Sequence, residues 1–138
     1  MSNQQEPNWQ PIKNLPMITG MIDGQVSEAQ SQYKNLLEAR ETPCILDDYT
    51  VNRVIEAFKE QQEFIWIYEK QLSIWKGEKL SIALMDEITR LQVQVGKWNK
   101  ALADILTLAE ELKSGTIEKK MAKSNLELGM EFVKKSLK

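Results

Sequence analysis

The sequence contains no histidine among its 138 residues. Histidine is the usual general base near neutral pH and a common metal ligand, so its absence excludes Ser-His and Cys-His nucleophile pairs and the usual zinc and di-iron sites. Glycine-rich phosphate-binding loops are also absent. We therefore predict a protein that is not an enzyme and that holds no metal or other cofactor.

Cysteine and long apolar runs are equally scarce. Cys44 is the only cysteine, so no disulfide forms within the chain and a reducing compartment is expected. The N-terminus lacks the basic and apolar regions of a signal peptide, and the longest apolar run covers only residues 64–68. The sequence therefore predicts a cytoplasmic protein without a membrane-spanning helix.

Proline is confined to the first third of the chain, at Pro7, Pro11, Pro16 and Pro43. Nothing after Pro43 interrupts long helices. A chain of this length buries one core of its own, and 42% hydrophobic with 28% charged residues is an ordinary globular composition. We predict an all-α fold over a single domain, residues 1–138.

A heptad pattern organises the helix predicted for residues 81–114. Its apolar positions recur at alternating steps of four and three, which is typical of helices that pack side by side as in a coiled coil. They are Leu84, Ile88, Leu91, Val95, Trp98, Leu102, Ile105, Ala109 and Leu112. The preceding helix, predicted for residues 48–77, has a similar length and a short connection to this one. We expect the two to form an antiparallel hairpin.

The helix over residues 48–77 carries a heptad that is broken only at Gln61, and it is apolar beyond that stripe. Phe64, Trp66, Ile67 and Ile74 project away from the heptad seam. A helix that is apolar around much of its girth is normally covered on several sides. This helix is therefore expected to be central in the bundle or covered by a second chain, with Trp66 pointing away from the other aromatic residues.

The first long helix is predicted for residues 15–41, with a loose segment before it over residues 1–14 in which Trp9 anchors the chain to the bundle. Gly20 and Gly24 lie four residues apart in this helix, where each costs roughly 0.5–1 kcal/mol relative to alanine. Two explanations stay open. The glycines serve tight packing or a bend within the chain, or they form a close-approach groove for another helix or a ligand.

The C-terminal part is predicted to form a short helical hairpin over residues 116–137. Residues 113–138 hold seven lysines against three glutamates, whereas the other 112 residues hold 11 basic against 17 acidic residues. Lysines near a helix C-terminus are favoured by the helix dipole. The alternative is contact with nucleic acid or an acidic partner. Only one aromatic residue and no arginine lie in this tail, so we expect nucleic acid not to be the partner.

The tail reads GTIEKKMAKSNLELGMEF, and Leu46–Val54 reads LDDYTVNRV. These segments resemble uncharacterised bacterial helical proteins with a GTIE…SDxELG-type ending, in which aspartate stands where this chain has Asn125. Both residues are common near helix starts. The resemblance covers about the last two-thirds of the chain and implies a bacterial source. It implies no activity and no site residues.

The enzyme class that remains as an alternative is an all-α, magnesium-dependent nucleotide phosphohydrolase. Such enzymes need no histidine and hold the metal on carboxylates spaced three residues apart on facing helices. Glu60 and Glu63 have this spacing. Because magnesium requires several oxygen ligands at once, a second carboxylate pair is needed, and no aspartate follows a glutamate by three residues.

The sequence therefore favours a binding or scaffolding protein of unknown partner. We predict a homodimer formed through the surplus apolar arc of the helix over residues 48–77, with Phe64, Trp66, Ile67 and Ile74 as candidate interface residues. Closed two-fold dimers are the commonest soluble assemblies. The alternative is that the first helix and the C-terminal hairpin cover this arc within one chain.

Overall fold

A computed structural model of the chain describes residues 6–42, 46–114 and 116. Its elements are a short 3-10 helix η1 (Ile12–Asn14) and three long helices, α1 (Leu15–Arg40), α2 (Asp48–Lys76) and α3 (Ile82–Lys113). The all-helical class with three long helices is confirmed. Cys44 and the helical hairpin predicted for 116–137 lie outside the described residues, apart from Thr116.

Local signals at the helix starts explain where α2 and α3 begin. The side chain of Asp47 accepts a hydrogen bond of 2.7 Å from the backbone N–H of Thr50, and Ser81 accepts one of 3.3 Å from Leu84. Each bond satisfies an amide that has no partner within its helix. In α1, which has no such side-chain cap, Pro16 occupies the first turn, where a missing N–H costs nothing.

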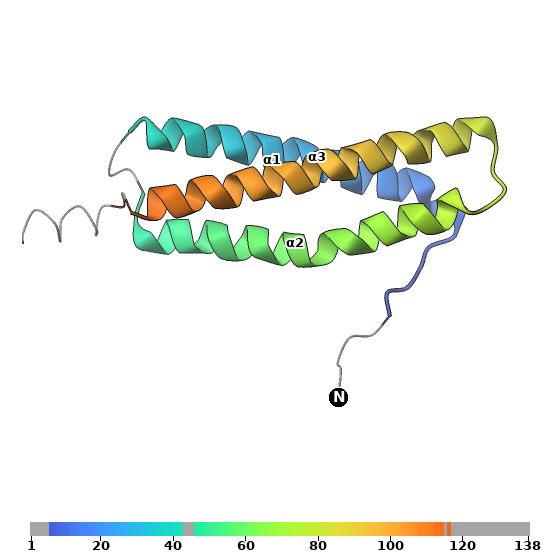
Figure 1. The fold of residues 1–138 in the computed structure, drawn as a ribbon, viewed down its shortest axis with the longest axis horizontal. Helices are drawn as coiled ribbons and strands as arrows, with labels where there is room; N and C mark the ends of the chain where they lie inside the picture. Colours follow the sequence, from blue (N-terminus) through green and yellow to red (C-terminus); the bar gives the residue numbers. More distant parts are fainter. Residues whose placement is uncertain (1–5, 43–45, 115, 117–138) are drawn as a thin grey trace, which may run out of the picture.

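The helix at the centre of the bundle is α3. Both α1 and α2 pack along α3, and neither packs as extensively on the other (Figure 1). Helices α2 and α3 form the predicted antiparallel hairpin, joined by a short connection after Lys76. Of the two possibilities for α2, a central place in the bundle is therefore wrong, because α1 and α2 both pack on α3. Coverage of α2 by a second chain stays a prediction.

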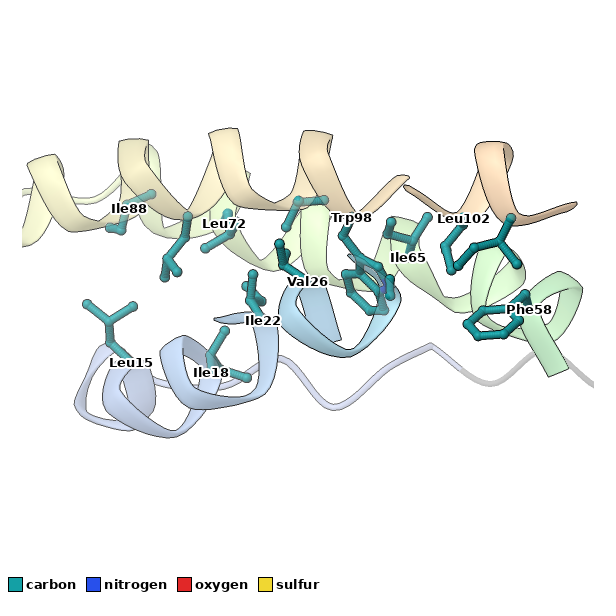
Figure 2. Packing of buried hydrophobic residues seen from close by; sticks show 14 of the residues in the cluster. Leu15, Ile18, Ile22, Val26, Phe58, Ile65, Leu72, Ile88, Trp98 and Leu102 are labelled. Atoms are coloured by element: carbon teal, nitrogen blue, oxygen red, sulfur yellow. The ribbon is translucent and has the colours of Figure 1, made fainter. Parts of the chain in front are cut away.

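The core contains buried residues from all three helices, which point toward one another in Figure 2. The heptad predicted on α3 is confirmed, because its members between Ile88 and Ala109 are all buried. Helix α2 contributes Val51, Phe58, Ile65, Leu72 and Trp75. Burying a large apolar side chain stabilises the fold by about 1.5–3 kcal/mol relative to leaving it exposed.

Gln61, the one polar residue in the α2 heptad, has a specific role in this core. Its side-chain oxygen accepts a hydrogen bond of 3.2 Å from the indole N–H of Trp98 on α3. The ring of Tyr68 packs edge-on against the same indole, with 5.2 Å between ring centroids. Burial raises the pKa of Tyr68 above its usual value. The break in the heptad therefore provides the acceptor that a tryptophan between two helices needs.

Polar contacts fasten the outer edges of the bundle. The two guanidinium N–H groups of Arg90 donate to the carboxylate of Asp23 at 3.0 and 2.9 Å, which joins α3 to α1. Gln94 donates a third bond to Asp23 at 2.9 Å. At the opposite end, the hydroxyl of the buried Thr116 donates to Asp48 at 2.6 Å. That bond holds the chain after α3 against the start of α2.

Candidate interaction surface

The N-terminal strap, which we define as residues 6–11, lies against α2. The side-chain oxygen of Gln71 accepts a hydrogen bond of 2.6 Å from the backbone N–H of Gln10. The same amide donates to the Gln10 carbonyl at 3.3 Å, and the indole N–H of Trp75 donates to that carbonyl at 3.0 Å. Gln71 is only 4% exposed, so a buried amide of α2 holds both backbone groups of one strap residue.

Trp9, in the strap, lies on the outer side of α2. Its ring packs edge-on against Trp66, with 6.4 Å between centroids and 74° between the ring planes. The expectation that Trp66 stands apart from the other aromatic residues is therefore wrong. The sequence pattern of α2 alone could not predict this contact, because Trp9 belongs to a non-helical segment. Part of the surplus apolar arc is thus covered by the chain's own N-terminal strap.

On one side of the strap lies an inner groove between α1 and α2, with a volume of about 350 Å³. Its walls are almost entirely apolar. They are formed by Pro7, Asn8, Trp9, Gln10, Met17, Ile18, Met21, Phe64, Ile67, Tyr68 and Gln71. Helices α1 and α2 both pack on α3, and they leave an open seam between themselves on the side that faces away from α3. The groove lies in this seam.

On the other side of the strap lies an outer hollow of about 520 Å³. Its lining mixes apolar and charged side chains. It comprises Glu6, Pro7, Trp9, Glu63, Phe64, Trp66, Ile67 and Lys70. The inner groove and the outer hollow are two parts of one surface that the strap divides, because they share four lining residues: Pro7, Trp9, Phe64 and Ile67.

Four large apolar side chains on this surface remain accessible in a single chain. Met17 is 51% exposed, Met21 44%, Phe64 50% and Trp66 49%. Together with Ile67, which is half-buried between them, we call these residues the apolar face. Contiguous exposed apolar surface beyond a few hundred Å² usually marks an interaction site. Such an arrangement is suited to contact with another apolar surface.

The four predicted interface residues have different positions. Phe64 and Trp66 are each about half exposed, and Ile67 lines both the inner groove and the outer hollow. Ile74 is half-buried and lines neither. Sequence analysis missed Met17, Met21 and Gln71. The signal for Gln71 was a glutamine placed between Tyr68 and Trp75, on the apolar stripe of its helix.

Gly20 and Gly24 do not serve tight packing within the described chain. A Cβ built on either residue meets no atom within 4 Å, and both residues are exposed. The explanation that they pack closely against another helix of the bundle is therefore wrong. Because α1 turns its apolar stripe toward α3, its glycines face outward. A bend in the helix and close approach by a partner or ligand both stay predictions.

The carboxylates of Glu60 and Glu63 are both exposed on α2. Within residues 6–42, 46–114 and 116, no group of three or more acidic, cysteine or histidine side chains lies close enough to hold a metal ion. The second carboxylate pair that magnesium needs is therefore not present in this part of the chain. Glu63 instead lines the outer hollow beside Trp66.

Comparison of the chain with protein-family models, with curated proteins and with solved structures finds no match. The resemblance of its C-terminal segment to bacterial helical proteins therefore stays a prediction, as does the role of the tail lysines beyond Lys113. None of the described helices is long and apolar enough to cross a membrane.

Proposed function

We propose that this chain is a non-catalytic binding or scaffolding module of the cytoplasm that self-associates through its apolar face. The observation that supports this most is the gathering of Met17, Met21, Phe64 and Trp66 on one surface, each about half exposed. Single exposed apolar residues are common on any protein, but a contiguous group is not.

The chemistry of the apolar face fits a protein surface as its partner. Methionine side chains are flexible and polarisable, so Met17 and Met21 adapt to the shape of an opposing surface. Phe64 and Trp66 supply the large aromatic anchors on which binding free energy is usually concentrated. A closed two-fold dimer is the simplest assembly that covers such a face completely.

Light scattering tests this proposal. The wild-type protein should have about twice the 15.9 kDa mass of one chain. Trp66→Glu places a charge on the apolar face and should shift the protein toward the monomer, because burying an unpaired carboxylate at an interface is costly. Its helix content, measured by circular dichroism, should stay unchanged, because Trp66 lies outside the core.

Val93→Glu is the matched control. Val93 is 57% exposed on α3 and belongs to neither the inner groove nor the outer hollow. The Val93→Glu substitution introduces the same charge as Trp66→Glu at an apolar position of similar exposure, so the dimer should persist. A wild-type protein that stays monomeric at high micromolar concentration would refute the proposal.

A further inference from the structure

The outer hollow contains a pair of opposite charges whose arrangement suits a second copy of the chain. Glu63 and Lys70 lie seven residues apart on α2, which is two helical turns, so their side chains share one face of the helix. Both are exposed, and neither forms an ion pair within the residues that the structure describes. Trp66 and Ile67 lie between them on the same face.

We propose that two copies pair through antiparallel α2 helices related by a two-fold axis that passes between Trp66 and Ile67, so that Glu63 of each copy meets Lys70 of the partner subunit. This arrangement deepens the proposed function and rests on it. It specifies which part of the apolar face is buried and in what register.

The symmetry follows from the positions of the charges. A two-fold axis perpendicular to the helices and midway between positions 63 and 70 places Glu63 of each copy beside Lys70 of the partner subunit, and Trp66 beside Ile67 of the partner subunit. Contacts across a two-fold interface are reciprocal, because a residue that contacts a second residue of the partner is matched by the same contact in reverse. Two attractive ion pairs therefore form for each dimer. The apolar pair Trp66 and Ile67 is then at the centre, flanked by charges at both ends, which is the usual anatomy of an interface.

The charges also disfavour a parallel pairing of the two α2 helices. A parallel, in-register pairing of α2 places Glu63 against Glu63 and Lys70 against Lys70, and like charges opposite one another oppose association. Glu6 is the third charged residue of the outer hollow, and its carboxylate accepts a hydrogen bond of 3.4 Å from the indole N–H of Trp9. Glu6 belongs to the strap, so Glu63 and Lys70 are the two charged residues of the outer hollow that lie on α2 itself.

A charge-swap experiment on the full chain tests the arrangement. Dimer dissociation constants are measured by analytical ultracentrifugation at low ionic strength for wild type, Glu63→Lys, Lys70→Glu and the double variant. Each single variant creates two like-charge contacts and should weaken the dimer about tenfold or more. The double variant restores two opposite-charge pairs and should recover most of the affinity.

Mixing the two single variants gives the sharpest result. A Glu63→Lys chain against a Lys70→Glu chain forms two attractive pairs, so an equimolar mixture should dimerise although each variant alone is largely monomeric at the same concentration. Glu110→Lys and Lys97→Glu are matched controls, because both positions are exposed on α3 and lie outside the outer hollow. They should leave the wild-type affinity unchanged.

The possible outcomes separate the two proposals. A monomeric wild type overturns the proposed function and this arrangement together. A dimeric wild type whose affinity is unaffected by Glu63→Lys overturns the antiparallel arrangement and leaves the proposed function intact. Weakening in both single variants without recovery in the double variant or the mixture overturns the reciprocal pairing as well.

Discussion

Gln71 holds Gln10 by both of its backbone groups, although 61 residues separate them in sequence. The amide of Gln71 presents one acceptor and one donor to the strap, as a neighbouring peptide group would. Trp75 adds a second donor to the same Gln10 carbonyl. The position of Trp9 on the outer side of α2 depends on this anchor.

Replacing Gln71 with leucine, which has a similar volume, should therefore destabilise the protein. The variant removes two hydrogen bonds and leaves the N–H of Gln10 without its partner, at a cost of roughly 1–3 kcal/mol. Urea unfolding followed by circular dichroism measures the change. Gln92→Leu is the control, because Gln92 is exposed on α3, and it should change the free energy of unfolding by less than about 0.5 kcal/mol. Equal stability of the two variants would contradict the anchoring role of Gln71.

A second prediction concerns Gln61 and Trp98. Gln61→Leu completes the apolar heptad of α2, so the sequence pattern alone predicts a gain in stability. The structure predicts a loss, because the indole N–H of Trp98 then has no acceptor between the two helices. A double-mutant cycle with Trp98→Phe decides between the two. The change caused by Gln61→Leu should become smaller in the Trp98→Phe background, whereas additive effects would show that the two side chains are not coupled.

These two glutamines show what the sequence could and could not predict. Helix periodicity identified the core residues of α3, because it depends on residues close together in the chain. Periodicity predicts which face of a helix is buried but not which helix covers it, so α3 rather than α2 turned out to be central. The partners of Gln61 and Gln71 lie 37 and 61 residues away, and no local pattern contains them.

The candidate surface was predicted in part for the same reason. Phe64, Trp66 and Ile67 were recognised as surplus apolar residues on α2, but the contributions of Met17 and Met21 depend on how α1 is placed beside α2. The strap has no helical period, so its path along α2 was not predictable. Gly20 and Gly24 suggested close packing, yet they face away from the bundle.

The core is tested by Leu102→Ala on α3. Leu102 is fully buried, and truncating such a side chain leaves a cavity that costs about 2–5 kcal/mol. For a chain of this size the melting temperature should fall by more than about 6 °C. Val93→Ala on the exposed face of the same helix should change the melting temperature by no more than a degree or two. Both are measured at one protein concentration, because dimerisation itself raises the apparent stability. An unchanged melting temperature in the Leu102→Ala variant would show that Leu102 is not part of the core.

The contact between α1 and α3 predicts a pH dependence. Hydrogen bonds from Arg90, and then from Gln94, hold the pKa of Asp23 below its ordinary value of 3.8. The folded state therefore binds this proton less readily than the unfolded state. The resulting stabilisation is fully present above about pH 4 and is lost as the pH falls through the lower pKa of the folded protein.

Asp23→Asn removes the titrating group of this contact. Its free energy of unfolding should fall less steeply than that of wild type as the pH is lowered below about 4. Arg90→Met should flatten the same part of the profile, because it removes the first cause of the pKa shift. Urea unfolding at a series of pH values measures the slope. A wild-type slope in both variants would exclude a contribution from Asp23.

The central claim is that two chains associate so that the apolar face of each is covered by the other. Sedimentation equilibrium of the wild-type protein over a wide range of concentrations tests it most directly, because it reports mass without depending on molecular shape. We expect the mass to rise with concentration from one chain of 15.9 kDa toward two and to level off there, as a closed two-fold assembly requires. A constant mass of one chain up to high micromolar concentration, or a mass that grows without limit, would contradict the claim.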